Sequence, residues 1–172
     1  MPRSRTDAAS VSRVKRTAIL VVVLVAAGCG GGGGPRLSKA AFIEHGDAIC
    51  AKYRAKNQEL NKNAPAKNPT DPSATDAQVK ASAPILEKLA DNLRGARHEF
   101  SALRPPAEVE TDWKNTLDDI DQLAVKLDTA AESARAVDRQ RVVNEYGGIL
   151  RLNHRISTFE QDYGFSVCGA QG

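Results

Sequence analysis

The chain has 172 residues, 41% of them hydrophobic and 5% aromatic, and a formal net charge of +3. Residues 1–28 hold five of the 24 basic residues and one of the 21 acidic residues, so the other 144 residues carry a net charge of −1. This balance excludes the strongly basic surface typical of proteins that bind nucleic acid, whereas 144 residues are enough for one domain with its own core.

The first element along the chain is an apolar run over residues 18–27. Five basic side chains and one acidic side chain precede it, which is the charge pattern of an export signal. The run is ten residues long, whereas a helix needs about 20 apolar residues to span a bilayer. The sequence therefore predicts a cleaved signal peptide over residues 1–28 and disfavours a permanent transmembrane helix.

Cys29 follows the small residues 26–28, and this order resembles the bacterial lipoprotein signal, in which the cysteine is acylated and becomes the new N-terminus. Two acyl chains suffice for stable attachment, because each buried methylene contributes about 0.8 kcal/mol. We therefore expect the membrane as a partner through Cys29, with residues 29–36 as a glycine-rich tether and residues 37–172 as the folded domain. The alternative is simple cleavage near residues 27–28, which would leave Cys29 as a free thiol.

A first helix is predicted over residues 39–63. Ser38 is its expected N-cap, with Leu37 packed against Phe42 across the cap. Three prolines then fall within residues 65–75 and exclude a sustained helix, so this segment is a long connecting loop. Long loops are more often functional or disordered than short ones, so we expect any protein partner to dock here, with plain disorder as the alternative.

A second helix is predicted over residues 76–103. It begins at the pattern of a capping box, in which Thr75 is the N-cap and Gln78 reaches back to it. Pro84 interrupts the pattern, either by kinking one helix or by separating two shorter helices. The kinked single helix is the favoured interpretation.

The clearest hydrophobic period follows Pro105 and Pro106. Its spacings alternate between four and three, which predicts a third long helix that packs at a shallow angle, with the seam Trp113, Leu117, Ile120, Ala124, Leu127, Ala131 and Ala134. Asp138 is the expected N-cap of a fourth helix, which carries Val142, Tyr146, Ile149, Leu150, Ile156, Phe159 and Tyr163. Gly164 is the expected residue that ends it.

Four helices with connections of this kind predict an all-α fold, an antiparallel up-down-up-down four-helix bundle. With Cys29 acylated, Cys50 and Cys168 are the remaining pair in an oxidising compartment. Cys50 lies about 16 Å along the first helix, and the tail from Gly164 to Cys168 can extend about as far back from the fourth. We therefore expect a Cys50–Cys168 disulfide that ties the C-terminal tail to the first helix.

The layout as a whole resembles the small helical lipoproteins of high-GC Gram-positive bacteria. The likeness rests on the lipoprotein signal with its glycine run, the segment AFIEHGDAICAKY, the Pro-Pro between two long helices and the terminal YGFSVCG. The resemblance implies a cysteine in the first helix of the domain and another near the C-terminus. It implies no activity for any named residue.

No group of residues has the spacing of a catalytic or metal site. The histidines fall on three different predicted helices without a second ligand at helical spacing: His45, His98 and His154. Neither Cys-x-x-Cys nor Gly-x-Ser-x-Gly occurs. We interpret three acidic residues of the third helix as a solvated face: Asp118, Asp119 and Asp121. The sequence therefore predicts no enzyme, no metal site and no bound cofactor.

Two adjacent glycines, Gly147 and Gly148, lie within the fourth predicted helix, where each costs about 1 kcal/mol relative to alanine. The favoured explanation is close packing against a bulky residue of the third helix. The alternative is a hinge or a contact with a ligand.

These observations favour an exported protein, lipid-anchored to the outer face of the cell membrane, that serves as a non-enzymatic interaction or scaffold module. The expected partners are the membrane and an envelope protein, and not nucleic acid. The alternative is a bundle that binds a small ligand such as haem, lipid or metal between its helices, in a cavity near Gly147 and Gly148. An enzyme is the least supported class.

Overall fold

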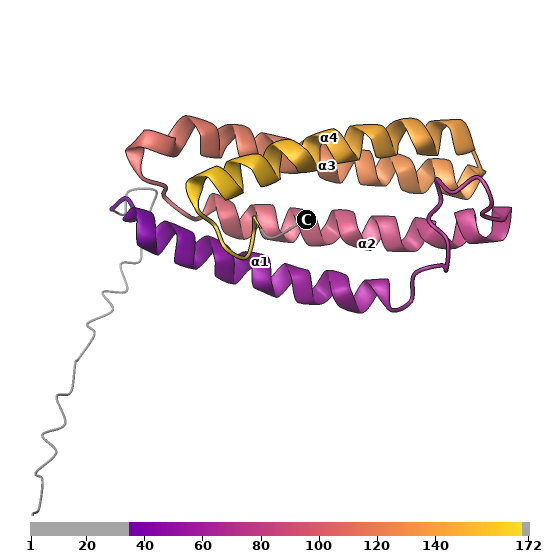
Figure 1. Cartoon of the computed structure of the whole chain (residues 1–172), viewed down its shortest axis with the longest axis horizontal. Helices are drawn as coiled ribbons and strands as arrows, with labels where there is room; N and C mark the ends of the chain where they lie inside the picture. Colours follow the sequence, from indigo (N-terminus) through magenta and orange to yellow (C-terminus); the bar gives the residue numbers. More distant parts are fainter. Residues whose placement is uncertain (1–34, 170–172) are drawn as a thin grey trace, which may run out of the picture. The chain divides into compact units, whose positions relative to one another are not determined.

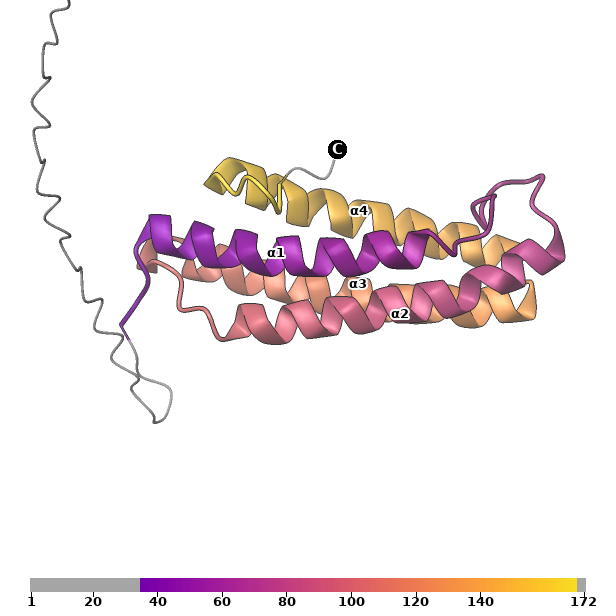
Figure 2. The ribbon, with the colours of Figure 1, turned by 90° about the horizontal axis from the view of Figure 1, so that it is seen from below.

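The computed structural model describes residues 35–169. This part of the chain forms α1 (Lys39–Asn61), α2 (Asp76–Ser101), the short 3₁₀ helix η1 (Ala107–Val109), α3 (Glu110–Ala136) and α4 (Arg139–Tyr163). Consecutive long helices run in opposite directions and pack side by side (Figure 1 and Figure 2). The predicted all-α, up-down-up-down bundle is therefore confirmed. None of these helices combines the length and the apolar character that a membrane span requires.

Polar caps fix where three of the helices begin. The Ser38 hydroxyl accepts a hydrogen bond from the backbone N–H three residues on, at 3.2 Å. Thr75 and Gln78 make both hydrogen bonds of the predicted capping box. The Asp138 carboxylate accepts a bond from the third N–H of α4 at 3.0 Å. Each cap satisfies a backbone N–H that the helix leaves without an internal partner.

The connection between α3 and α4 consists of Val137 and Asp138 alone. Val137 is the C-cap of α3 and has a left-handed backbone with φ 57°. The Val137 N–H donates to the Ala134 carbonyl at 3.1 Å, and the Asp138 N–H donates to the Ser133 carbonyl at 2.9 Å. These bonds satisfy the last carbonyls of the helix, but a residue with a Cβ adopts this conformation at a cost.

The proline within α2 does not end the helix. α2 continues through Pro84 as a single helix, in agreement with the favoured interpretation. The ring of Pro84 faces solvent, so it displaces no buried side chain.

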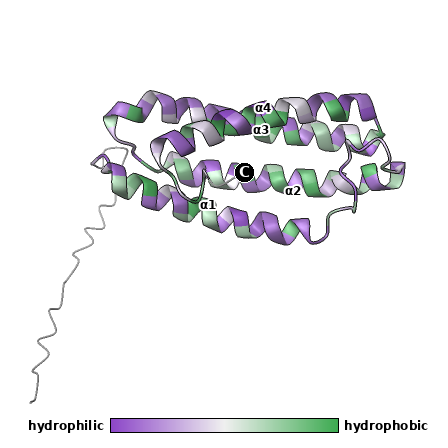
Figure 3. Cartoon of the chain, viewed as in Figure 1, coloured by the Kyte–Doolittle hydropathy of each residue, from purple (hydrophilic) through white to green (hydrophobic). Residues whose placement is uncertain are grey.

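The buried side chains form two clusters, and Leu93 and Ile149 pack against both. We call the first the aromatic cluster, because it contains the rings of Phe42, Tyr53, Phe100, Trp113, Tyr163 and Phe165. We call the second the alanine cluster, because it contains Ala74, Ala83, Ala90, Ala124, Ala130, Ala131 and Ala134. Along every helix, hydrophobic and hydrophilic residues are interleaved, as expected for amphipathic helices around a shared core (Figure 3).

The backbones of the first and last helices stay apart, although the Phe42 ring of α1 contacts the Tyr163 ring of α4. No Cα atom of α1 lies within 8 Å of a Cα atom of α4. The segment after α4, residues 164–169, turns back toward α1, and we call it the C-terminal strap (Figure 1). The predicted disulfide joins Cys168 of the strap to Cys50 of α1, with the two Cα atoms 5.2 Å apart. This bond confirms the predicted link between the tail and the first helix.

Hydrogen bonds hold the strap to α1 beside the disulfide. The Asp47 carboxylate accepts bonds from the Ser166 N–H at 2.9 Å, the Ser166 hydroxyl at 2.6 Å, the Val167 N–H at 2.9 Å and the Cys168 N–H at 3.0 Å. The Arg54 guanidinium donates to the Val167 carbonyl. Polar groups of α1 therefore hold the strap where the backbones of α1 and α4 do not approach each other.

The loop over residues 65–75 has internal hydrogen bonds. The Lys67 ammonium donates to the Ser73 hydroxyl at 2.8 Å and to the Ser73 carbonyl at 3.1 Å. Arg139, at the start of α4, donates to the Ala74 carbonyl at 2.7 Å, and Ala74 is buried in the alanine cluster. These contacts fix the end of the loop, and docking of a protein partner on it stays a prediction.

Candidate ligand-binding cavity

A partly open cavity of about 220 Å³ lies between the helices, with side chains of all four long helices in its wall. The wall supplied by α2 and α3 is apolar and includes Leu89, Leu93, Phe100, Ile120, Leu123 and Leu127. The polar part comes from α1 and α4 and includes Asn57, Asn153, Ser157 and Glu160. Because α1 and α4 stand apart, the side chains between them leave this space unfilled.

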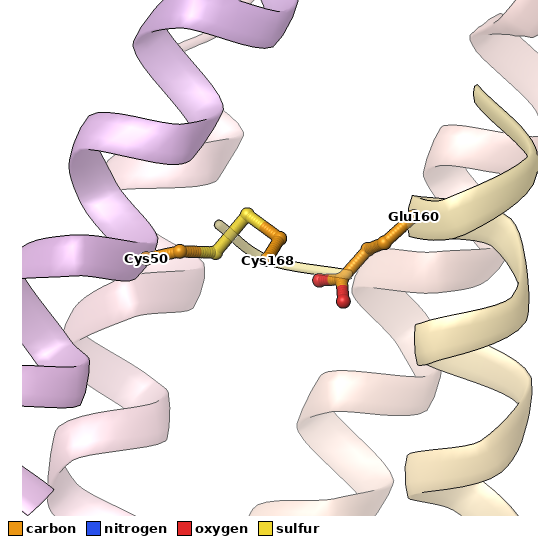
Figure 4. A group of neighbouring side chains, drawn as sticks. All are labelled: Cys50, Glu160 and Cys168. Atoms are coloured by element: carbon orange, nitrogen blue, oxygen red, sulfur yellow. A yellow bond between two sulfur atoms is a disulfide. The ribbon is translucent and has the colours of Figure 1, made fainter. Parts of the chain in front are cut away.

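Glu160 is the charged side chain of the cavity wall. It projects from α4 toward the disulfide, and its carboxylate and the sulfur atoms of Cys50 and Cys168 lie within 4.8 Å of one another (Figure 4). Only 8% of Glu160 is exposed. No residue in the described part of the chain donates a hydrogen bond to its carboxylate. Among the described residues, the fully buried side-chain polar atoms without a partner are Trp113 Nε1 and the Tyr163 hydroxyl, so the Glu160 oxygens retain some surface that opens on the cavity. A largely buried carboxyl group without a protein donor is unusual, because desolvation of its charge is costly unless a partner compensates.

The surroundings of Glu160 favour its neutral form. Burial is the main cause that raises its pKa to about 7, and the negative charge of Asp47 raises it further. The positive charge of Arg54 acts in the opposite direction but does not cancel these effects. The carboxyl group is therefore close to half ionised at neutral pH and faces a largely apolar space.

Asp47 remains ionised beside it. Burial alone would raise the pKa of Asp47, but the hydrogen bonds from Ser166, Cys168 and Val167 lower it below its ordinary value. The two neighbouring carboxyl groups therefore differ. Hydrogen-bond donors stabilise the charged form of Asp47, whereas Glu160 has no such donor.

The α1 side of the cavity is fixed by Tyr53. Its hydroxyl donates to Glu99 of α2 at 2.7 Å, and Glu99 also accepts a bond from Lys52 at 2.6 Å. Burial, followed by the neighbouring Glu99, raises the pKa of Tyr53 to about 12. Gly95 makes this approach possible, since a Cβ there would lie 2.6 Å from the tyrosine oxygen. The ring of Tyr53 is therefore held in place as part of the wall.

The structure brings together some of the residues that the sequence singled out. Cys50 and Cys168 form the predicted disulfide, and Cys50 also lines the cavity. Cys29 lies outside the described residues. Neither Gly147 nor Gly148 lines this cavity, although their neighbour Ile149 does. A Cβ on Gly148 would lie 3.1 Å from the aliphatic stem of Lys126 of α3, which agrees with the packing explanation.

The polar residues weighed as alternatives are exposed, except for the half-buried Asp119. The three histidines are exposed on three different helices: His45, His98 and His154. Asp119 pairs with Arg155 at 2.5 Å and Asp121 pairs with Arg97 at 2.9 Å, while Asp118 is exposed. These pairs support the interpretation of a solvated face on α3.

Glu160 was not singled out from the sequence, although a signal was present. It follows Ile156 by four residues and precedes Tyr163 by three, which places it on the predicted core face of the fourth helix. An acidic residue at such a position indicates either a buried partner or a functional carboxyl group.

Comparison of the chain with protein-family models, with curated proteins and with solved structures found no match.

Proposed function

We propose that this protein is an exported lipoprotein, anchored through Cys29, whose four-helix domain binds a small and largely apolar ligand in the cavity of the bundle. The observation that carries the proposal is the cavity of about 220 Å³ with apolar walls and one buried, unpartnered carboxyl group. Ligand sites in helical bundles have this composition, with many apolar side chains and few polar groups that orient the ligand.

The size of the cavity fits this role. An engineered cavity of about 150 Å³ between apolar side chains stays dry and binds benzene, so a larger one accommodates a somewhat larger molecule. The cavity shifts our preference from an interaction module, which the sequence favoured, to the small-ligand alternative.

The wall supports binding more than catalysis. The Ser157 hydroxyl donates to the His154 carbonyl at 3.0 Å, so its hydrogen is not directed to a base. The Tyr53 hydroxyl is likewise engaged by Glu99, and both cysteine sulfurs are in the disulfide. We therefore propose a non-enzymatic function.

The disulfide indicates an oxidising, extracytoplasmic compartment. The lipid anchor rests on the short apolar run and on the small residues 26–28 before Cys29. Cys29→Ala should release the protein from membranes, and the wild-type protein should carry an acyl adduct in an intact-mass measurement. Membrane retention of the variant after a high-salt wash, together with an unacylated wild type, would refute the anchor.

Binding can be tested with 1-octanol, a neutral probe with a short apolar chain, on the exported Cys29→Ala chain. NMR titration should show saturable shifts confined to residues of the cavity wall. Ala96 lines the cavity, and Ala96→Leu should weaken binding at least about tenfold by filling it. Ala81→Leu adds the same atoms on the exposed side of α2 and is the matched control. If octanol binds both variants equally, or if octanol, octylammonium and octanoate all fail to bind, the proposed function is wrong.

A further inference from the structure

We propose that the ligand is an organic cation, an ammonium group on an apolar chain, with the ammonium seated on the Glu160 carboxylate beside the disulfide. This inference rests on the proposed binding function of the cavity. It specifies the charge of the ligand, its orientation and the residue that recognises it.

The charges around this end of the cavity favour a cation. Asp47 and ionised Glu160 supply two negative charges, and Arg54 supplies one positive charge. Arg54 donates to the Val167 carbonyl and makes no hydrogen bond to Glu160. The side chains that α2 and α3 contribute to the cavity wall are apolar, so they supply no further charge. The described part of the site therefore lacks one positive charge, which an ammonium ligand would provide.

The Glu160 carboxylate, which has no donor in the protein, can accept hydrogen bonds from an ammonium group. An ammonium group carries hydrogen-bond donors and a positive charge, and hydrogen bonds between charged groups are stronger than those between neutral groups. A ligand carboxylate would instead face both Asp47 and Glu160 and would be repelled. A neutral alcohol could donate one hydrogen bond without satisfying the missing charge.

The shape of the cavity orients the ligand. Its α4 wall extends from Ile149 to Glu160, which is about 16 Å at the rise of an α-helix. Glu160 lies at the strap end of this wall, whereas Leu89 and Leu127 lie toward the alanine cluster. An unbranched alkyl chain therefore fits along the bundle axis, with its ammonium end at Glu160.

The proposal predicts a pH dependence with a definite sign. Without ligand, Glu160 gains its charge as the pH rises through about 7. An alkylammonium keeps its charge throughout this range, since amines of this type have pKa values near about 10. Cation binding should therefore strengthen between pH 6 and pH 8, because ionised Glu160 binds the cation and protonated Glu160 does not.

The experiment compares octylammonium, 1-octanol and octanoate on the exported Cys29→Ala chain by calorimetry at pH 6 and pH 8. We expect octylammonium to bind at least about tenfold tighter than octanol at pH 8, and to lose much of this advantage at pH 6. Glu160→Gln should abolish the advantage of octylammonium over octanol at pH 8. Glu132→Gln removes one acid from the exposed face of α3 and is the matched control.

The outcomes separate the two proposals. If octanol binds but octylammonium binds no tighter, or octanoate binds tightest, the cation inference is wrong and the cavity function stands. If none of the three binds, the proposed function itself fails. Should Glu160→Gln not fold, the pH dependence of octylammonium binding to the parent chain decides, and an affinity that is constant from pH 6 to pH 8 overturns the inference.

Discussion

The two ends of the bundle are packed with side chains of different size. In the alanine cluster, α2 and α3 bury small residues against Val142 of α4, and Ala90, Ala130, Ala131 and Ala134 are fully inaccessible. In the aromatic cluster, large rings fill the space among four helices and the strap. Small residues allow close helix packing, whereas large rings hold helices apart and leave gaps that their fixed shapes cannot fill. The cavity adjoins the second kind of packing.

The aromatic end depends on a few large contacts. The Phe42 ring is fully buried, and its centroid lies 5.0 Å from that of Trp113, 5.7 Å from that of Tyr163 and 5.5 Å from that of Phe165. It thereby joins α1 to α3, to α4 and to the strap. The alanine end has no comparable residue, because its contacts are spread over many small side chains.

The largest expected change in the free energy of unfolding comes from substitution of Phe42. Phe42→Ala removes a ring that three other rings contact and should lower the free energy of unfolding by about 4 kcal/mol. Phe42→Leu retains most of the buried apolar surface and should lower the free energy of unfolding clearly less than Phe42→Ala does. Chemical denaturation measures both. Equal and small losses for the two variants would contradict the central position of this ring.

Removal of the disulfide is expected to be the next largest effect. The Cys50→Ser/Cys168→Ser double variant should lose about 3 kcal/mol, because the crosslink spans 118 residues and limits the unfolded chain. The four helices should remain, since their N-caps and the alanine cluster do not involve the strap. Thermal melts followed by circular dichroism test this, with the reduced wild type as a second sample. If the double variant and the reduced wild type both melt at the temperature of the oxidised wild type, the strap does not stabilise the aromatic end.

Glu160 should make the stability of the aromatic end depend on pH. Its pKa is raised from 4.5 to about 7, so its contribution is full below about pH 4.5 and is lost as the pH rises through about 7. Relative to Glu160→Gln, the wild type should therefore lose about 3 kcal/mol over this range. The pKa of Asp47 is lowered, so its titration changes the stability only at a lower pH. Denaturation at several pH values provides the measurement, and parallel pH profiles for wild type and variant would contradict the raised pKa.

Replacement of a buried alanine by leucine, made once in the alanine cluster and once at the cavity, tests the difference in packing between these two regions. Ala131, in the alanine cluster, is fully buried, and Ala131→Leu should destabilise the protein by about 2 kcal/mol through overpacking. Ala96 is 6% exposed and faces the cavity, so Ala96→Leu should be nearly neutral. Comparable losses at the two sites, measured by denaturation, would mean that the cavity is not open space.

The smallest expected effect is a gain at the α3–α4 turn. Val137 is left-handed, a conformation that costs a residue with a Cβ about 1 kcal/mol or more and that glycine adopts freely. Val137→Gly should therefore raise the free energy of unfolding by somewhat less than about 1 kcal/mol, since glycine also increases the entropy of the unfolded chain. A loss of stability in denaturation would show that the valine side chain is needed for packing.

Features set by local patterns were predictable from the sequence. The caps at Ser38, Thr75 and Asp138 involve residues three positions apart, and the seam of α3 is a simple repeat. The disulfide followed from the count of cysteines and from the lengths of two segments. Helix order and direction followed from the connections, which is why the fold was predicted well.

Features set by distances between helices were not predictable. The cavity depends on how far α1 and α4 stand apart, which results from the combined volumes of many side chains. The bonds from Asp47 to the strap join residues about 120 positions apart, and no pattern in the sequence marks them. Glu160 stood at a core position by spacing, but the spacing could not show whether the fold would supply it with a partner.

Glu160 lines the cavity as a largely buried carboxyl group without a protein donor, and its proposed role is to bind a cation. Carbon-13 NMR of the Glu160 side chain measures its titration directly, in the free protein and with octylammonium. We predict a pKa of about 7 in the free protein and a clear decrease when the cation is bound. A pKa near the ordinary value of 4.5 that does not respond to octylammonium would contradict the account.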